Sequence, residues 1–293
     1  MGLNFILTSL SQGLAYAAMA LGVYITFKIL DFPDLTVDGT LPLGAAVSAR
    51  MITAGYDPFL SLGAALLAGA AAGVITGLIN TRLKIAPLLA GILTMTGLYS
   101  INLRIMGKPN IPLLRQRTIF SYFKNLGLQR PWNYILVLLI LLLIIKLLLD
   151  AFLKTQLGFA LRATGDNPQM IRSMGINTRT MKIIGLVLAN SLVAFSGAVV
   201  GQYQGFADVS MGIGTIIAGL ASVIIGEVII GEKSIFYATL AVITGSIIYR
   251  FSISIALSLG FAASDLKLLT AIIVIIFLST PKVKQYIKVG YNA

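Results

Sequence analysis

Residues 135–149 read ILVLLILLLIIKLLL, a run of aliphatic side chains interrupted only by Lys146. A helix needs about 20 mainly apolar residues to cross a bilayer, and comparable stretches recur along the 293-residue chain. In total 57% of the residues are apolar and 11% are charged, whereas about 25% of the residues in a soluble domain are charged. This pattern predicts an all-α polytopic integral membrane protein, with residues 1–293 forming one transmembrane domain.

The apolar stretches predict about eight to ten membrane-spanning helices. The second stretch is short and contains Arg50, so we expect a broken or partial second span. The first stretch lacks a basic leading segment and a convincing cleavage site, so we expect it to be retained as a helix. The predicted spans are residues 4–30, 42–55, 59–80, 86–105, 133–149, 183–203, 213–230, 236–257 and 267–280.

Lys and Arg in the connections predict the orientation of the bundle. If nine helices cross, one side receives eleven of these residues, in connections around 82–84, 154–182 and 233 and in the C-terminal tail. The other side receives five, all between Lys108 and Arg130. Because basic loops stay in the cytoplasm, we expect the majority side and the C-terminus to be cytoplasmic. The side of the N-terminus depends on whether 42–55 crosses fully.

The composition excludes several classes of function. Cys and His are both absent, which removes disulfides, thiolate nucleophiles and the commonest metal ligand and general base. The net charge of +12 comes from 22 Lys and Arg against 10 Asp and Glu. We attribute it to cytoplasmic loops and anionic headgroups of the lipid bilayer, and expect no nucleic-acid partner. No catalytic residue, metal site or cofactor is expected in this chain.

Two predicted helices carry glycines four residues apart. Such a stripe of small residues lets two helix backbones approach closely, and we favour contacts within one chain over contacts between copies. In contrast, 135–149 is expected to face lipid, with Lys146 extending along its own stem to the membrane interface. The striped glycines are Gly69, Gly73 and Gly77 in one helix and Gly197, Gly201 and Gly205 in the other.

The segment 31–42, DFPDLTVDGTLP, carries three carboxylates between two apolar stretches. Pro33 and Pro42 are expected to interrupt helical hydrogen bonding. Non-helical backbone within a membrane requires protein or water to satisfy its polar groups, and broken segments of this kind line substrate paths in transporters. We favour this interpretation over an ordinary surface loop or a cation site. The candidate path residues here are Asp34, Thr36, Asp38 and Thr40.

Residues 151–182 form a basic connection that contains a short capped helix. Asn167 is a favourable N-cap, Pro168 suits the first helical position, and Gly175 suits the position after the end. Met170, Ile171 and Met174 are expected to share one face. A helix of about two turns is unstable alone, so this face needs a surface, either the headgroup layer or the groove of another protein.

Isolated polar groups within apolar stretches complete the candidate sites. Intramembrane charges are costly, and therefore face the bundle, a water-filled path or each other. Glu227, near a helix end, suits either an ion pair or a proton-coupled carrier. The other groups noted are Asn190, Gln202 and Gln204 and the arginines Arg50, Arg104 and Arg250. Of these, Asn190, Gln202 and Glu227 are added to the candidate translocation path.

Nucleotide binding in this chain is rejected. Residues 226–234, GEVIIGEKS, superficially resemble a phosphate-binding loop, but Glu232 intervenes before Lys233 and the segment continues an apolar span. A phosphate-binding loop joins a strand to a helix and surrounds the phosphates with backbone N–H groups. A structural scaffold and an intramembrane enzyme are also disfavoured, whereas an ion-coupled secondary transporter using Glu227 or an Asp of 31–42 remains the alternative function.

The chain resembles the permease subunits of ATP-binding-cassette (ABC) importers of the branched-chain amino acid and ribose permease superfamily. The run 162–176, RATGDNPQMIRSMGI, is similar to that family's cytoplasmic loop, and the resemblance implies that its helix docks on an ATPase subunit. The implied coupling residues are Arg162, Gly165, Asn167, Pro168, Met170, Ile171, Met174 and Gly175. The segment 32–39, FPDLTVDG, resembles a single-permease branch often linked to tryptophan or other aromatic amino acids.

The resemblance also implies the remaining parts of the machine. A second permease copy, two cytoplasmic ATPase subunits and an extracytoplasmic binding protein or lipoprotein are the expected partners, in a bacterial cytoplasmic membrane. ATP and Mg²⁺ would belong to the ATPase, so this chain is expected to be a transport subunit and no enzyme. The expected substrate is an amino acid, aromatic or branched-chain, with a sugar or nucleoside as the alternative.

Overall fold

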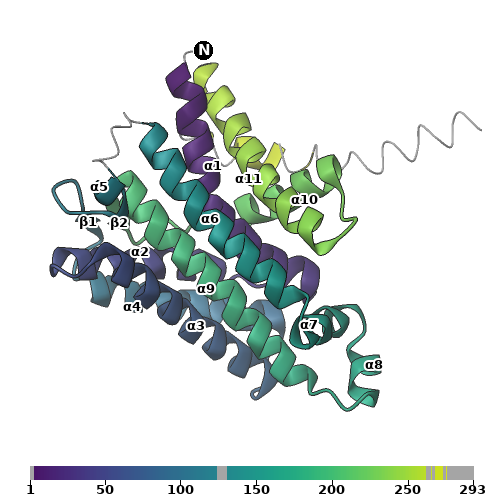
Figure 1. The fold of residues 1–293 in the computed structure, drawn as a ribbon. Coiled ribbons are helices and arrows are strands. Elements are labelled where there is room, and N and C mark those ends of the chain that lie inside the picture. The colour runs from purple at the N-terminus through teal and green to yellow at the C-terminus, as the bar shows by residue number, and fades with distance from the viewer. Residues whose placement is uncertain (1–2, 124–130, 262–264, 266–267, 273–274, 276–293) are drawn as a thin grey trace, which may run out of the picture.

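The computed structural model describes residues 3–123, 131–261, 265, 268–272 and 275. These residues form a helical bundle with two short strands (Figure 1), which confirms the predicted all-α polytopic class. The elements are α1 (Leu3–Tyr24), the π-helical turn η1 (Ile25–Ile29), α2 (Val37–Thr53), α3 (Pro58–Thr81), α4 (Pro87–Met106), β1 (Asn110–Pro112), α5 (Ile119–Tyr122), α6 (Trp132–Leu153), α7 (Gln156–Asp166), α8 (Pro168–Ser173), α9 (Thr178–Gln204), β2 (Phe206–Asp208), α10 (Thr215–Ile230) and α11 (Ile235–Ser258).

Six helical segments in the described part of the chain are long and apolar enough to cross a membrane: Asn4–Ile29 and the helices α3, α4, α6, α9 and α11. The helices α2 and α10 have only 17 and 16 residues. Each is preceded by non-helical chain, and neither helix is long enough to cross a membrane by itself. The predicted span 267–280 lies largely outside the described residues, as does the C-terminal tail.

The helix α9 runs through the bundle, and its contacts fix the directions of its neighbours. Ser196 near the end of α9 donates a hydrogen bond of 2.8 Å to the carbonyl of Ala15, whereas Gly22, further along α1, lies against Ala189. The helix α1 is therefore antiparallel to α9. The same reversed order relates α3 to α9, so α1 and α3 run in one direction and α9 in the other.

The helix α2 begins inside the bundle. Its first turn contacts the middle of α9, where Thr40 donates to Asn190 over 2.8 Å, and Gly44 then lies against Ala194. The helix therefore runs parallel to α9 from mid-depth onwards. Residues 31–36 return non-helically from the end of η1 to this depth, so the predicted partial span is half non-helical and half helical.

The position of Pro42 differs in one detail from the prediction that it interrupts a helix, because Pro42 lies inside α2. Proline removes one intrahelical hydrogen bond, the bond to the carbonyl four residues earlier, which here is that of Asp38. Gly212 fits against this site so closely that a Cβ there would lie 2.0 Å from the Asp38 carbonyl oxygen and 2.5 Å from Pro42 Cδ. The gap left by proline is therefore where the chain leading to α10 packs.

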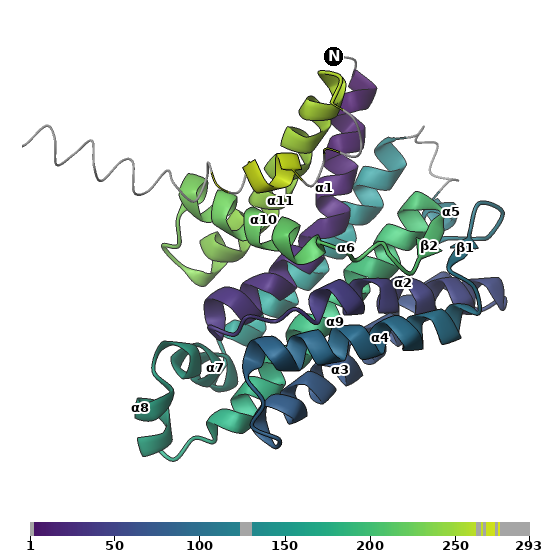
Figure 2. The ribbon, with the colours of Figure 1, turned by 180° about the vertical axis from the view of Figure 1, so that it is seen from behind.

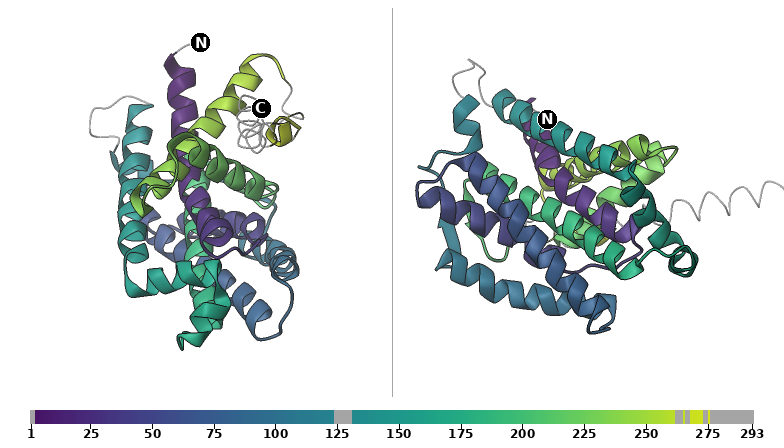
Figure 3. Two further views of the ribbon diagram at one scale, coloured as in Figure 1. Left: turned by 90° about the vertical axis from the view of Figure 1, so that its right-hand side faces the viewer. Right: turned by 60° about the horizontal axis from the view of Figure 1, so that its bottom comes forward.

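The helices α7 and α8 lie at one end of the bundle, and the β1–β2 pair lies at the other (Figure 2). The two strands are antiparallel, with Ile111 opposite Ala207. Because α1 is antiparallel to α9, which ends just before β2, the chain begins at the strand end. Two further views show α1 passing through the middle of the bundle (Figure 3).

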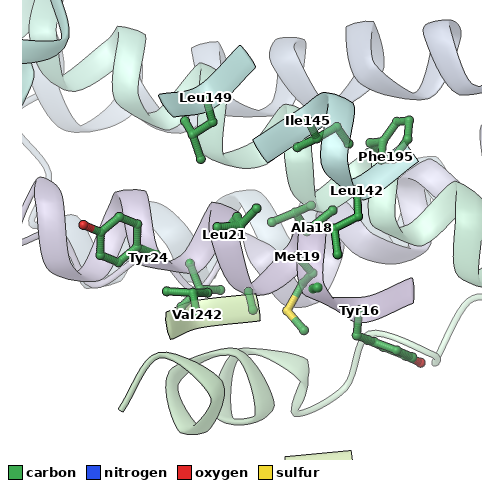
Figure 4. Close-up of a cluster of buried hydrophobic side chains, with 14 of the residues drawn as sticks. Tyr16, Ala18, Met19, Leu21, Tyr24, Leu142, Ile145, Leu149, Phe195 and Val242 are labelled. Atoms are coloured by element: carbon green, nitrogen blue, oxygen red, sulfur yellow. The ribbon is translucent and has the colours of Figure 1, made fainter. Parts of the chain in front are cut away.

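The largest buried cluster surrounds α1. Leu142, Ile145 and Leu149 of α6 lie on one side of α1, and Val242 of α11 lies on the other (Figure 4). Burying an aliphatic side chain of this size contributes roughly 1.5–3 kcal/mol in water, but lipid competes for the same contact. Close packing of small residues therefore contributes more to holding these helices together than apolar burial does.

The glycine stripes are used within the chain, as predicted. A Cβ on Gly73 would lie 2.4 Å from the Leu186 carbonyl oxygen of α9, and one on Gly197 would lie 1.9 Å from the Leu41 carbonyl oxygen of α2. Gly205 has a different role, because it ends α9 with a φ of 80°. The remaining striped glycines Gly69, Gly77 and Gly201 also face neighbouring helices.

Lys146 does not reach the interface, so that prediction was wrong. Its side chain is buried and donates a 2.5 Å hydrogen bond to Asp150, one turn along α6. Asp150 also accepts from Thr239 of α11 over 2.6 Å, and the ammonium lies 3.7 Å from the ring centroid of Phe236. A carboxylate at i+4 makes burial of the cation possible, and the lipid-facing side of α6 is formed by other residues.

Candidate functional site

Two half-helices begin beside each other in the middle of the bundle. The helix α2 begins at Val37 and α10 begins at Thr215, and Asp38 connects their first turns. From this point α2 runs toward the strand end, whereas α10 runs toward the α8 end, where Glu227 meets Lys28 of η1. We call the meeting of these two helix starts the half-helix joint.

Asp38 holds the joint together. Its Oδ2 accepts a 2.8 Å hydrogen bond from the Gly214 backbone N–H, and its Oδ1 accepts 2.8 Å from the Ile216 N–H and 3.1 Å from the Thr215 hydroxyl. These are orphan donors at the start of α10, where a negative charge is also favoured by the helix dipole. A side chain of α2 therefore caps α10.

Asp34, Thr36, Thr40 and Asn190 form a buried polar cluster beside the joint. Asp34 accepts from the Thr36 N–H over 2.9 Å and from the Asn190 amide over 2.9 Å. Asn190 in turn accepts from Thr40 over 2.8 Å, and the Thr36 hydroxyl lies 3.0 Å from that of Thr76 in α3. Four of the seven predicted path residues therefore meet, and Asp34 satisfies the Thr36 N–H of the non-helical segment.

Gln202 lies apart from this cluster, toward the strand end. Its oxygen accepts from the Ile119 N–H over 2.9 Å, and its amide donates to Ser48 over 3.0 Å and to Ser61 over 3.3 Å. The residue thus ties α9 to α2, α3 and α5. It belongs to a second buried network, separate from that of Asp34.

Glu227 also lies apart, at the α8 end. Its carboxylate accepts a 2.8 Å hydrogen bond from Lys28, whose ammonium is also 3.3 Å from Glu232. All three side chains are partly exposed. Glu227 therefore takes the ion-pair alternative left open by the sequence, linking η1 to the end of α10.

The helix α8 has the caps that the sequence predicts. Asn167 accepts a 3.0 Å hydrogen bond from the Met170 N–H, Pro168 occupies the first position, and Gly175 follows the helix with a φ of 83°. Arg172 donates to Thr178 over 2.9 Å, which ties α8 to the start of α9.

The apolar face of α8 is divided between two surfaces. Met170 and Met174 are 52% and 65% exposed, whereas Ile171 is 2% exposed. Ile171 therefore packs against its own chain, which corrects the expectation that all three side chains share one exposed face. Residues at i and i+4 point the same way on a helix and residue i+1 turns about 100° away, so only the methionines are available to a partner.

The helix α7 connects α8 to the core of the bundle. A Cβ on Gly165 would lie 2.0 Å from the Ile29 carbonyl oxygen, so α7 touches the end of η1 directly. Arg162 lies with its guanidinium carbon 5.8 Å from the ring centroid of Phe159, and its buried Nε has no hydrogen-bond partner among the described residues. The helix α7 is thus in direct contact with the turn that precedes the half-helix joint.

Polar groups at the strand end stabilise the connections there. Asp57 caps α3 and accepts a short hydrogen bond from the Tyr122 hydroxyl, which lowers the pKa of the carboxyl group and raises that of the phenol. The pKa of Asp208 is lowered by hydrogen bonds from the Ser210 side chain and backbone.

Sequence reasoning gave no role to Arg250, which the structure places in the wall of a cavity. Its guanidinium carbon lies 3.6 Å from the ring centroid of Tyr16. The available signal was an arginine within an apolar stretch, but no local pattern links residue 250 to residue 16.

Comparison with known proteins gives three concordant findings. The family model described as "Branched-chain amino acid transport system / permease component" matches residues 5–279. A tyrosine transport system permease protein of Clostridioides difficile strain R20291 is 48% identical over 275 residues, covering 94% of this chain and 90% of that protein. The ribose import permease of Escherichia coli K12 is 26% identical, covering 76% of this chain and 69% of that protein.

One solved structure has a similar fold. It is an inward-facing ABC transporter described as of metal-chelate type, with a TM-score of 0.53 and 17% identity, covering 96% of this chain and 87% of that one. At this identity the likeness concerns the fold alone. The family model and the relatives confirm the family that the segments 162–176 and 32–39 indicated.

Proposed function

The chain belongs to the family of permease components of branched-chain amino acid transport systems, it is a membrane subunit of an ABC importer, and we propose that its substrate is an aromatic amino acid. The observation that supports this choice of substrate is the 48% identity to a tyrosine permease, sustained over 94% of this chain. The family description and the ribose permease, which is 26% identical, give weaker support for any particular substrate.

Coupling to ATP is assigned to α8. Met170 and Met174 present an exposed apolar surface on a basic connection, and methionine is well suited to fill irregular grooves on a partner. The partner in this proposal is a cytoplasmic ATPase subunit that carries ATP and Mg²⁺. The α8 end is then cytoplasmic, and the chain begins on the outer face.

The half-helix joint is assigned to the wall of the translocation path. Asp34, Asp38, Thr36, Thr40 and Asn190 supply its polar groups, while a second copy of the chain completes the path. Opening and closing follow from the contact between α7 and η1, because η1 leads into residues 31–36. Gln202 and Glu227 act as supports at the two ends of this movement, and an external binding protein delivers the substrate.

Reconstitution tests this proposal. The permease is placed in proteoliposomes with the ATPase and binding protein of the same transport system, and uptake of radiolabelled tyrosine is measured with each component omitted in turn. We expect ATP-dependent uptake only with all components, with phenylalanine and tryptophan competing. Selective uptake of ribose or leucine would contradict the substrate, and uptake driven by an ion gradient without the ATPase would contradict the mechanism.

A further inference from the structure

A cavity of about 360 Å³ lies between α1, α10 and α11, next to the half-helix joint. Its place is fixed by Ser246, which donates a 3.0 Å hydrogen bond to the Gly13 carbonyl and so holds α11 against α1. The side chains that define its wall are Tyr16, Thr215, Ile217, Tyr249, Arg250 and Thr270. Binding pockets for small molecules measure about 300–1,000 Å³, so the cavity has room for one small metabolite.

Among the residues of this wall that the structure describes, Arg250 is the only basic side chain. Its guanidinium lies over Tyr16 and 5.9 Å from the ring centroid of Tyr249, and its buried Nε has no hydrogen-bond partner in the described part of the chain. Among the described residues no carboxylate lies within ion-pair distance of it. By contrast, Lys28 and Lys146 each have a carboxylate partner.

The missing counter-charge points to a ligand. A cation within an apolar span is costly and requires a partner, and the planar guanidinium binds a carboxylate with two parallel hydrogen bonds. The start of α10 cannot serve as the anion site, because Asp38 already occupies the Gly214 and Ile216 N–H groups. Arg250 is therefore the group in this wall that is available to an anion.

The rest of the wall suits an apolar or aromatic side chain. Tyr16 and Tyr249 present rings, and Ile217, which is 46% exposed, adds aliphatic surface. We propose that this cavity is a substrate site in the permease, in which Arg250 binds the carboxylate of the amino acid and the rings with Ile217 contact its side chain. This inference rests on the proposed function and adds to it the residues that recognise the substrate.

The test uses the full-length permease in phosphatidylcholine nanodiscs, with the shift in melting temperature across a millimolar titration as the readout. The probes are tyrosine and tyrosinamide, which lacks the carboxylate. We expect wild type to bind tyrosine at least about tenfold more tightly than tyrosinamide, since a hydrogen bond to a charged group contributes about 1.5–3 kcal/mol. Arg250→Gln is expected to lose this preference, and Arg104→Gln, at an exposed arginine at the end of α4, is expected to retain it.

A second variant keeps the test informative if Arg250→Gln fails to fold. Ile217→Glu places a carboxylate in the same wall, so it is expected to raise the melting temperature of the empty protein and abolish tyrosine binding. Ile217→Gln, which is similar in size and uncharged, is expected to weaken the binding of tyrosine and tyrosinamide alike and to keep the ratio between them. Unchanged discrimination in Arg250→Gln, or tyrosine binding by Ile217→Glu, would overturn the assignment. Loss of tyrosine binding on adding phosphatidylglycerol would reassign the arginine to a lipid headgroup.

Uptake by the reconstituted importer separates the two proposals. If wild type imports tyrosine and Arg250→Gln imports it at the same rate and half-saturation, the cavity is not the substrate site and the proposed function stands. If wild type imports no aromatic amino acid, the proposed function itself fails. If both proposals hold, wild type and Arg104→Gln import tyrosine, and the rate of tyrosine uptake by Arg250→Gln is lower by about tenfold or more.

Discussion

Replacing Asp38 with alanine tests whether the half-helix joint is held by one side chain. The carboxylate accepts hydrogen bonds from two backbone N–H groups and one hydroxyl at the start of α10. All three donors lose their acceptor in Asp38→Ala. The Thr215 hydroxyl still donates to the Gly212 carbonyl over 2.9 Å, so the Gly214 and Ile216 N–H groups carry the main loss.

The size of the effect follows from those two donors. A buried donor left without a partner costs about 1–3 kcal/mol, so Asp38→Ala is expected to destabilise the protein by about 2–6 kcal/mol. Asparagine has one side-chain oxygen and cannot accept from both N–H groups, so Asp38→Asn is expected to lose one acceptor and to destabilise the protein by about 1–3 kcal/mol. The loss in Asp38→Ala concerns the contact between α2 and α10 and leaves the long spans intact.

The assay compares melting temperature in nanodiscs with ATP-driven uptake in proteoliposomes. Asp57→Ala is the matched control, because Asp57 also accepts two backbone N–H groups at a helix start but is exposed at the strand end. Water can replace that cap, so we expect a smaller loss of stability and normal uptake. Equal destabilisation by Asp38→Ala and Asp57→Ala would refute the reasoning, as would full uptake by Asp38→Ala.

Three further predictions concern other parts of the molecule. Replacing Met170 and Met174 with Asp is expected to abolish ATP-driven uptake without lowering the melting temperature, because both side chains are exposed; unchanged uptake would contradict docking through α8. Gly44→Ala would place Cβ 1.8 Å from the Ala194 carbonyl oxygen and is expected to cost about 1–3 kcal/mol or more in melting experiments. Gly63→Ala meets no atom within 4 Å and is expected to be neutral or stabilising by up to about 1 kcal/mol. The lowered pKa of Asp208 means that its stabilisation is present above the unfolded value of about 3.9 and is lost as pH falls through the folded value; Asp208→Asn should remove this acid dependence from hydrogen exchange of the β1–β2 pair.

The long spans and the α8 caps were predictable because their signals are local. An apolar run of about 20 residues needs no tertiary partner to be recognised, and Asn167, Pro168 and Gly175 act on neighbouring backbone groups. The broken second span was also predicted, from a short apolar stretch that contains Arg50. Even the face used by the glycine stripes follows from spacing alone.

The depth of the half-helices was not predictable in the same way. Thr40 meets Asn190 and Asp38 meets Gly214 across more than 140 positions of sequence, so the depth depends on which segments pair in space. Lys146 shows the same limit: its partner Asp150 is one turn away, but whether the pair faces lipid or protein is decided by α11. The same limit explains why the sequence did not predict that Ile171 is buried while Met170 and Met174 are exposed.

The two halves of the bundle repeat one pattern in opposite directions. The helix α1 is followed by a non-helical return, the half-helix α2 and the full helix α3, and α9 is followed by a non-helical return, α10 and α11. Inverted repeats of this kind place substrate sites near the midplane, at their interface. Here that interface is the half-helix joint, with the Arg250 cavity beside it.

The link from α8 to this interface is short. The helix α7 touches η1 at Ile29, and η1 leads within ten residues to Asp38. A displacement of α8 is thus expected to move the start of α2 relative to α10, across hydrogen bonds made by one carboxylate, which re-form more easily than close helix packing. Asp38→Asn, which keeps one of the two acceptors, should therefore lose less stability than Asp38→Ala and alter the ATP used per substrate imported, whereas Arg250→Gln should alter substrate recognition. If Asp38→Asn instead altered substrate recognition and Arg250→Gln altered the ATP used per substrate, coupling would pass through α11.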